Sequence, residues 1–395
     1  MPFSGSWRDH RRILALSIAL ALGLVRASHA GPPRVETSPE TSPEPAAKVS
    51  TSSALDSSIY VRSDSDHTTV VSPRIHFRQG FEHRRGETAM NLVYAADVWT
   101  SASIDIRTAA SPRVTEQRDE IVASVEHRSR AGWEVGLGYR MSNEPDFRAN
   151  GVTLSFAWEG LARNVRLESR VTLEHDRVGR SGDPQFTRRL QAITSAFAYT
   201  QVLGRATLLQ LAVEQRASFG YHASPYRWVG LGGASNCSGV SLCVPEVHPD
   251  RRARFAMVAR LRQGMGKRVS AGLDYRYYID SWALQSHTVG GDLRVQPLAS
   301  LLLALEYRAY FQSGAWFYRS NYSLAPPGGF ATRDRELSSM FDHRVSAVVD
   351  WSHRWTKVAV GSGVLVGVAI HGYDDFLGLA RVVAGEGSWV GRLEF

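Results

Sequence analysis

The sequence has little cysteine, with only Cys237 and Cys243 among its 395 residues, and this excludes a disulfide-rich scaffold. After residue 30 it also lacks any apolar run near the ~18 residues that a membrane-spanning helix needs. The net charge of +8 comes almost entirely from arginine. These arginines are scattered over the chain without a dense patch, so nucleic-acid binding is not expected.

The N-terminus has the three parts of a secretory signal peptide. Positive charges between Trp7 and Arg12 precede the apolar run Ile13–Val25, and the small residues Ser28 and Ala30 stand before a cleavage site. The apolar run is too short to span a bilayer. We therefore expect residues 1–30 to be removed on export. The residue directly after the expected cleavage site is Gly31 and not a cysteine, so a lipid anchor is not expected.

The next segment has the composition of a disordered linker. Residues 31–57 are rich in Pro, Ser, Thr and Glu, and the motif TSPE occurs at Thr37 and again at Thr41. Such a segment cannot bury enough apolar surface to offset the entropy of ordering it. The sequence thus predicts a linker over 31–57 and a folded domain over 58–395.

Long stretches of the folded domain alternate between apolar and polar residues. In DYRYYID, Tyr275, Tyr277 and Ile279 alternate with Asp274, Arg276, Tyr278 and Asp280. The same period of two occurs in Trp133–Ser142, Val165–Glu174, Arg254–Arg262 and Leu301–Gln312. These runs last about ten residues, the length that a tilted strand needs to cross a bilayer, whereas strands of soluble sheets average about five or six.

The connections between these strands give a second indication. Short links, such as Ser129–Gly132 and Gly264–Lys267, alternate along the chain with longer ones, such as Gly220–Asp250 and Ser313–Met340. One short connection, near Asp280–Trp282, falls in the long series. Bacterial membrane barrels sort periplasmic turns and extracellular loops in this way. We therefore predict an all-β fold, a transmembrane antiparallel up-and-down β-barrel. It has about sixteen strands, with about fourteen or eighteen as alternatives because strand boundaries shift by a few residues.

The C-terminus favours the bacterial outer membrane. The chain closes on an alternating strand with Trp389, Gly391, Leu393 and Phe395 on one face. A terminal Phe on such a strand resembles the C-terminal signal of outer-membrane barrels, and we expect Trp389, Leu393 and Phe395 to engage the barrel-assembly machinery. The expected location is the outer membrane, in contact with its lipid and lipopolysaccharide.

Several stretches resemble a bacterial family of outer-membrane β-barrel proteins that is catalogued only as a domain of unknown function. These are YVRSDSDHTTVVSP from Tyr60, AASPRV from Ala109, GYHASPYRWV from Gly220, PEVHPDRR from Pro245 and DYRYYIDSWALQSHT from Asp274. The resemblance runs from Tyr60 to Phe395. It implies the fold and the location, and it brings no activity, ligand or catalytic residue.

If the apolar set of each strand faces lipid, the polar set lines the lumen. The candidate lumen-lining residues are Asp274, Arg276, Tyr278, Asp280, Glu306, Arg308, Tyr310, Arg166, Glu168 and Arg170. Two matched triplets, Asp274-Arg276-Tyr278 and Glu306-Arg308-Tyr310, begin at similar distances from a short turn and should lie at similar heights. They form either a structural network that satisfies polar groups or a constriction that screens solutes by charge.

A few single residues suggest other roles: a hydrolase site, a disulfide or metal site, and contact with lipopolysaccharide. Ser286 and His287, with Asp280 nearby, suggest a hydrolase, but adjacent residues on a strand point to opposite faces, so no enzyme and no cofactor are expected. Cys237 and Cys243 favour a loop disulfide over a metal site that would include His248. Arg227, Arg251 and Arg252 are candidates for contact with lipopolysaccharide phosphates.

The favoured function is a channel for small solutes with a charged lumen. The alternative is a structural or interaction barrel with a plugged lumen, whose extracellular loops bind a partner. The loops Gly220–Asp250 and Ser313–Met340 are rich in aromatic residues and could fold inward or outward: Tyr221, Tyr226, Trp228, Trp316, Phe317, Tyr318 and Tyr322.

Overall fold

The computed structural model describes residues 50–101, 114–232, 237, 242–323 and 325–395. The expected signal peptide 1–30 and the linker up to residue 49 lie outside the described residues. So does the motif at Ala109. No helix in the described ranges is long and apolar enough to cross a membrane.

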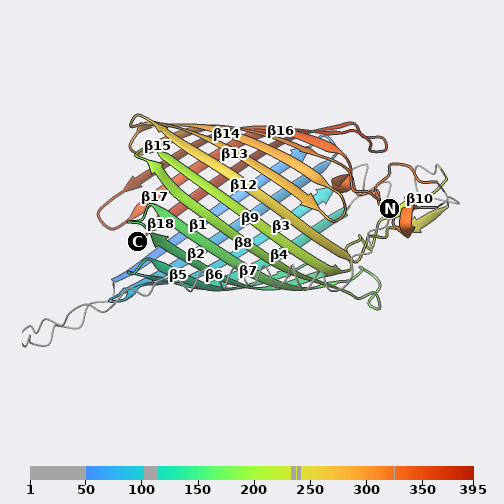
Figure 1. Cartoon of the computed structure of the whole chain (residues 1–395), viewed down its shortest axis with the longest axis horizontal. Coiled ribbons are helices and arrows are strands. Elements are labelled where there is room, and N and C mark those ends of the chain that lie inside the picture. Colours follow the sequence, from blue (N-terminus) through green and yellow to red (C-terminus); the bar gives the residue numbers. More distant parts are fainter. Residues whose placement is uncertain (1–49, 102–113, 233–236, 238–241, 324) are drawn as a thin grey trace, which may run out of the picture. The chain divides into compact units, whose positions relative to one another are not determined.

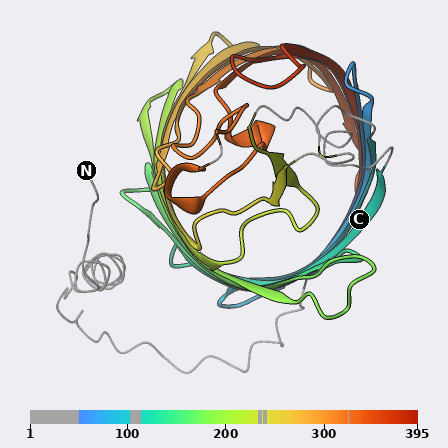
Figure 2. The ribbon, with the colours of Figure 1, turned by 90° about the vertical axis from the view of Figure 1, so that its right-hand side faces the viewer.

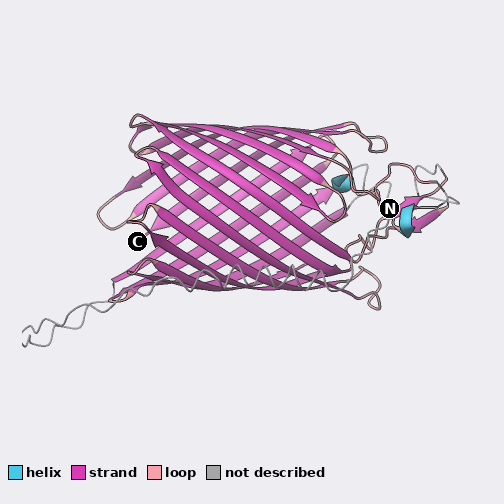
Figure 3. Ribbon diagram, viewed as in Figure 1, coloured by secondary structure: helices cyan, strands magenta, loops and turns pink. Residues whose placement is uncertain are grey.

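Most of the described chain is β-strand (Figure 3). The strands are β1 Ser50–Asp64, β2 Thr68–His83, β3 Gly86–Ser101, β4 Val114–Ser129, β5 Trp133–Asn143, β6 Phe147–Gly160, β7 Val165–Val178, β8 Arg188–Gly204, β9 Thr207–Gly220, β10 Trp228–Gly230, β11 Cys243–Pro245, β12 Arg251–Met265, β13 Val269–Asp280, β14 Gln285–Leu298, β15 Leu301–Gln312, β16 Met340–Arg354, β17 Ala359–Tyr373 and β18 Arg381–Glu394. Two 3₁₀ turns, η1 Pro327–Gly329 and η2 Arg335–Leu337, lie in the loop before β16.

Sixteen of these strands form one closed antiparallel barrel, which confirms the predicted fold and strand number (Figure 1). Each strand pairs with its neighbours in the sequence, except that β9 pairs with β12 because β10 and β11 form a separate small sheet. The barrel closes where β1 pairs with β18, with Ser58 opposite Val390. Closure leaves no edge strand, so the barrel backbone has its hydrogen-bond partners within the sheet.

The two faces of the barrel wall differ as the alternation predicts. Outward-facing Leu154, Leu305 and Val366 are 59%, 56% and 58% exposed, although they are large apolar residues in the middle of long strands. The polar side chains of Ser286 and Asp342, by contrast, face inward and are buried. A band of exposed aliphatic side chains around a closed cylinder fits a hydrocarbon environment and would be costly in water.

Aromatic residues border this aliphatic band. Near the end with short turns, five tryptophans are exposed: Trp133, Trp158, Trp351, Trp355 and Trp389. Toward the other end, outward-facing tyrosines pair with histidines, as in Tyr275 Oη with His287 Nδ1 (2.8 Å) and Tyr307 Oη with His343 Nδ1 (2.8 Å). Rings that carry a polar atom are typical of the two membrane–water interfaces.

Most connections are sorted by length, as expected, but 65–67, 144–146 and 281–284 at the end with the long loops are as short as the turns at the opposite end. At one end, here called the short-turn end, the strands are joined by 84–85, 130–132, 161–164, 205–206, 266–268, 299–300 and 355–358. The other end, here called the loop end, carries the long loops 221–250 and 313–339. One boundary differs from the prediction: β1 begins at Ser50, so residues 50–57, expected in the linker, belong to the barrel. Ladder pairing with β2 and β18 orders them despite their polar composition.

The two faces can be compared with neighbouring residues in β6. We expect Leu154→Arg to lower the free energy of unfolding in lipid by ~2–4 kcal/mol, because the charge would enter hydrocarbon. Ser155→Arg places the same side chain in a hollow of the lumen and should change it by less than about 1 kcal/mol. Denaturant unfolding from bilayers, followed by tryptophan fluorescence, measures both. Equal losses would contradict the assignment of faces.

Candidate functional site

The inner wall of the barrel is lined by arginines paired with carboxylates on neighbouring strands. Arg262 of β12 contacts Asp292 of β14 (2.8 Å), and Arg308 of β15 contacts Asp342 of β16 (3.1 Å). Other pairs include Arg78–Glu87, Arg118–Asp97, Arg140–Glu120, Arg166–Glu159, Arg216–Glu174, Arg344–Glu386 and Arg392–Asp350. Most inward charges are therefore compensated inside the lumen.

The matched triplets of β13 and β15 both face the lumen, but they do not stand level with each other. Thr288 of β14 lies opposite both Arg276 and Tyr310, and Gly290 lies opposite both Asp274 and Arg308. The triplets are thus offset by one inward position. Arg308 pairs with Asp342 on the far side of β15, because this carboxylate is buried and adjacent in the ladder.

The Asp342 pairing continues toward the barrel seam. His371 Nδ1 lies 2.9 Å from Asp342 Oδ2, and Arg62 Nη2 donates to His371 Nε2 at 2.7 Å. Since Nε2 accepts, the proton of the neutral ring is on Nδ1, the nitrogen nearer to Asp342. A polar chain thus links β15, β16, β17 and β1. Glu306, the acid of the β15 triplet, lies 3.8 Å from Arg294 of β14.

Arg166 is the centre of a second inward cluster on the opposite part of the wall. Its guanidinium lies 3.0 Å from Glu159, 3.0 Å from Glu168 and 3.5 Å from Glu134. Glu168 and Arg170, also singled out from the sequence, line the same hollow of the lumen. This part of the wall therefore holds more carboxylates than guanidiniums around Arg166.

Two cavities lie along the lumen. The outer cavity, about 260 Å³, is lined at the loop end by residues that include Arg254, Arg276, Tyr278, Trp282 and Glu336. The central cavity, about 400 Å³, is lined by residues that include Glu134, Arg166, Arg170, Glu214 and Arg276.

Arg276 lines both cavities, so its guanidinium stands at their junction. It lies over the ring of Tyr278, 5.7 Å from the centroid. Within the described ranges, neither Arg276 nor Arg254 has a carboxylate oxygen within 4.0 Å, unlike the paired arginines of the wall. Two uncompensated positive charges therefore face the outer cavity, and Arg276 also faces the central cavity.

Asp280 is bonded to four of the residues that line the outer cavity. Its carboxylate accepts hydrogen bonds from Arg252 (2.6 Å), Tyr278 Oη (2.9 Å) and the amides of Trp282 (2.9 Å) and Leu284 (3.1 Å). Arg252 also lies over the Trp282 ring, 4.1 Å from the centroid. Asp280 was predicted to line the lumen, but its donors use the carboxylate to fix the short β13–β14 connection.

The long loops 221–250 and 313–339 fold inward over the lumen (Figure 2). They pack on each other through a small apolar cluster, here called the loop core, of Val229, Leu231, Tyr322 and Ala331. Val247 and Ala331 exchange two backbone hydrogen bonds of 3.0 Å. Phe317, Tyr318 and Tyr322 are buried, so these loop aromatics form packing contacts and do not present an outward surface.

A buried carboxylate joins the two loops. Glu246 accepts hydrogen bonds from the amide of Ser224 (3.1 Å) and from Thr332 Oγ1, and it pairs with Arg227 (3.4 Å) and His248 (3.4 Å). Burial alone would raise the pKa of Glu246, but Arg227, His248 and Thr332 outweigh it and lower the pKa to about 2. Glu246 is therefore ionised at neutral pH and stabilises the inward position of both loops.

His222 lies beside this assembly as a neutral ring. Its Nδ1–H donates to the carbonyl of Gly220 (3.0 Å), and its Nε2 accepts from Ser218 Oγ (2.8 Å). Burial first, and then the charge of Arg254, lowers the pKa of His222 to about 4. Its ring contacts Trp282 edge-on, with centroids 5.5 Å apart.

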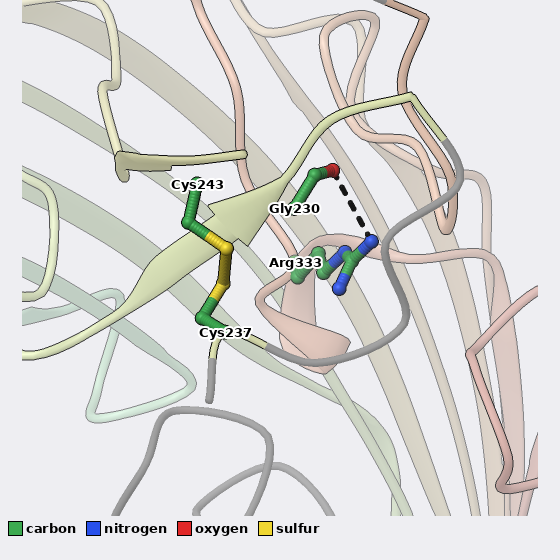
Figure 4. Close-up of a disulfide and its surroundings, with 4 residues drawn as sticks. All are labelled: Gly230, Cys237, Cys243 and Arg333. Atoms are coloured by element: carbon green, nitrogen blue, oxygen red, sulfur yellow. Dashed lines mark hydrogen bonds between the residues drawn. A yellow bond between two sulfur atoms is a disulfide. The ribbon is translucent and has the colours of Figure 1, made fainter. Parts of the chain in front are cut away.

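The Cys237–Cys243 disulfide expected from the sequence is present in loop 221–250 (Figure 4). The Cα atoms are 5.9 Å apart, and Cys243 begins β11, opposite Gly230 of β10. Arg333 Nη2 donates to the carbonyl of Gly230 at 3.3 Å, which ties the other loop to this hairpin. Across the described ranges no group of three or more His, Cys, Asp or Glu residues could hold a metal ion.

The structure separates the residues of the hydrolase reading. Ser286 is buried on the inward face, whereas His287 faces outward and bonds Tyr275. Of the arginines expected at lipopolysaccharide, Arg227 and Arg252 instead pair with Glu246 and Asp280 inside the barrel, because both acids are buried there, while Arg251 is exposed. Trp389 and Phe395 of the C-terminal strand are exposed on its outer side.

The inward loops and the partners of Arg308 were not found from the sequence. Glu246 carried a weak signal, as an acid among the apolar and proline residues of PEVHP. Its contact with Thr332, across 86 positions, could not be read from local pattern.

One family model matches part of the chain. A family model described as "Protein of unknown function (DUF3570)" matches residues 184–354, from just before β8 to the end of β16. This confirms the resemblance to a family of unknown function, over a shorter span than Tyr60 to Phe395. A search of curated proteins finds no match.

Solved structures similar to this chain are outer-membrane proteins. A bacterial polysaccharide outer membrane secretin is 9% identical with a TM-score of 0.49, covering 87% of this chain and 98% of its own. OpdK from Pseudomonas aeruginosa is 9% identical with a TM-score of 0.43, covering 88% and 99%. OprD from the same organism is 7% identical with a TM-score of 0.41, covering 87% and 94%. These values say nothing about what this chain binds.

Loss of the Glu246 charge should loosen the loops. We expect Glu246→Gln to speed amide hydrogen exchange in 221–250 by about tenfold or more at pH 7, since charge-assisted hydrogen bonds are lost. Asp183→Asn removes an exposed carboxylate in another loop, where Arg180 lies 3.7 Å away, and should leave exchange unchanged. Equal exchange in the Glu246 variant and the wild type would show that this carboxylate does not hold the loops.

Acid should weaken the loop packing in two steps. His222 has a folded-state pKa of about 4, below its usual 6.5. Its contribution to the free energy of unfolding therefore falls as the pH drops below 6.5 and is lost near pH 4. Glu246, whose pKa is lowered, stabilises the loop packing above pH 4.5, and this stabilisation is lost as the pH falls toward 2. Tryptophan fluorescence should report the first step through Trp282. His222→Gln should abolish that step, and its persistence in this variant would assign it elsewhere.

Proposed function

We propose that the chain is an outer-membrane channel that admits small solutes and screens them by charge. The observation that carries this proposal is the pair of hollows in the lumen, about 260 and 400 Å³ in volume, with Arg276 at their junction. A barrel of about sixteen strands encloses enough space for water unless loops fill it. We place the short-turn end in the periplasm and the loop end outside the cell, after export by the signal peptide.

The route through the barrel begins at the outer cavity, where the inward loops leave hollow space against β12–β15. Arg254 and Arg276 attract anions into this cavity, while Asp334 is already engaged with Arg227 (3.0 Å). Beyond Arg276 the solute meets the central cavity, where Glu134 and Glu214 face Arg166 and Arg170. Charges of both signs facing each other in a narrow passage select solutes by charge and by size.

The second candidate function is a plugged barrel whose loops bind a partner. The loop core and the Glu246 contacts favour it, because they make the inward loops a compact, fixed obstruction. A plug and a constriction differ in whether ions cross. Single-channel recording in planar bilayers separates them: steady conductance supports the channel, and silence supports the plugged barrel.

The assembly route is a further part of the proposal. The outward-facing Trp389 and the exposed Phe395 are available to the barrel-assembly machinery before β18 pairs with β1. Exposed Arg251 remains a candidate for contact with lipopolysaccharide at the loop end.

Reversing the charge of Arg276 tests the screening directly. We expect Arg276→Glu to lower the ratio of anion to cation permeability by ~3-fold or more, because two unit charges change beside both cavities. The reversal potential in a salt gradient measures this ratio. Arg205→Glu makes the same charge change at a short turn, away from the cavities, and should leave the ratio near that of the wild type. Unchanged selectivity in Arg276→Glu and Arg308→Glu would refute the screening role.

A further inference from the structure

A cluster of basic and aromatic residues lies on the outer side of the barrel at the short-turn end. We call it the rim patch; it consists of His83, Arg84, Arg85, Thr88, His127, Arg130 and Trp133, and most of these residues line one open recess. The patch belongs to β2–β5 and shares no residue with the lumen cavities. Nothing in the proposed channel uses it.

The rim patch is a rigid arrangement. The amide of Arg130 donates to the carbonyl of Arg85 at 3.1 Å, which joins the β2–β3 and β4–β5 turns. The rings of His83 and His127 are stacked, with centroids 5.3 Å apart and planes at 9°. Trp133 packs against His127 with a centroid distance of 5.3 Å. Three guanidiniums are thus carried on turns whose backbones are fixed to each other.

A chain of hydrogen bonds sets the proton positions on the two histidines. The amide of Arg85 donates to His83 Nδ1 (3.2 Å), so the proton of the neutral ring is on Nε2, which donates to Thr88 Oγ1 (3.2 Å). Thr88 then donates its hydroxyl proton to His127 Nδ1 (3.0 Å). His127 therefore carries its proton on Nε2, and in the described part of the chain this N–H has no hydrogen-bond acceptor.

The charges of the patch are also uncompensated. Arg84, Arg85 and Arg130 are exposed, and no carboxylate of the described residues lies within 4.0 Å of them. A free N–H donor and three guanidiniums around one recess fit a phosphate group, which accepts several hydrogen bonds and carries negative charge.

The wall next to the patch supplies an apolar surface. Thr88, His127 and Val135 lie opposite one another on β3, β4 and β5. The next outward row is Met90, Val125 and Leu137, which are 51%, 45% and 55% exposed. A ligand with its phosphate on the patch would therefore lay an apolar tail along this row, toward the middle of the aliphatic band.

We propose that the rim patch binds an anionic glycerophospholipid of the leaflet at the short-turn end. Its phosphate receives the His127 Nε2–H and the guanidiniums of Arg84, Arg85 and Arg130, Trp133 lies at the level of the glycerol ester groups, and the acyl chains cover Met90, Val125 and Leu137. Trp and Arg are both favoured at this depth of a bilayer.

The test uses the full chain purified in detergent, with phosphatidylglycerol or phosphatidylethanolamine added, and counts bound lipids by native mass spectrometry. The wild type should retain phosphatidylglycerol at least about tenfold better than phosphatidylethanolamine. The triple variant Arg84→Gln, Arg85→Gln, Arg130→Gln should lose this preference. The matched control Arg163→Gln, Arg205→Gln, Arg268→Gln removes the same charge from other short turns and should keep it.

A single variant separates geometry from charge. His127→Phe keeps an aromatic ring on His83 but removes the N–H donor, so it should weaken retention of both phospholipids by about threefold or more. Circular dichroism and thermal unfolding in detergent verify folding; if the triple variant fails to fold, Arg84→Gln and Arg130→Gln are measured singly. Equal retention of the two lipids by the wild type, equal loss in the control triple, or preferential retention of lipopolysaccharide at this patch would each overturn the proposal.

Discussion

The structure depends on one constraint: backbone amides and carbonyls have no water to bond inside a membrane, so each must find its partner in the sheet. Pairing of β1 with β18 meets this constraint by removing both edges. Once the sheet is closed, every strand has one face in hydrocarbon and one face in an enclosed space. The separation of outward-facing leucines and valines from inward-facing aspartates and arginines is the consequence.

The enclosed space then imposes its own balance of charge. Inward arginines and carboxylates pair across strands around most of the wall, and small residues make room for them. Gly367 is an example, because a Cβ there would come within 2.8 Å of Ser346 Oγ and 2.9 Å of Glu386 Oε1. Arg254 and Arg276, like Arg170 and Arg260 of the central cavity, have no carboxylate partner among the described residues, and their charges face hollow space. A wall built only for stability would gain from pairing them, and this contrast supports a role for them toward solutes.

Much of the fold could be predicted from local pattern. The period of two in segments such as Asp274–Asp280 depends only on which solvent each face meets, so the strands and their faces follow from it. Side-chain and backbone pairing between neighbouring strands was harder to predict. The partner of Arg308 depends on the register of β15 against β16, and the strand start at Ser50 depends on neighbours on either side, so polar Ser52 and Ser53 gave no strand signal.

The loops were the least predictable part. Their aromatic content indicated packing or binding alike, and the choice rests on contacts such as that of Glu246 with Thr332, which join residues far apart in the chain. No periodic pattern encodes such a contact. The candidate site could therefore be predicted only in part. The alternation of the strand gives the inward direction of Arg276 and Tyr278, but the cavity that they line exists because the loops cover it.

The β1–β18 seam places Ser58 beside Val390, so the first and last strands of the barrel are neighbours. The ribosome therefore releases the final strand before the first can acquire its second partner, and the cylinder cannot form while the chain is being made. Until then two unpaired edges persist, and such edges can pair with another copy of the chain. Pairing of β1 with β18 is thus the most non-local step in forming the barrel, and such steps are slow.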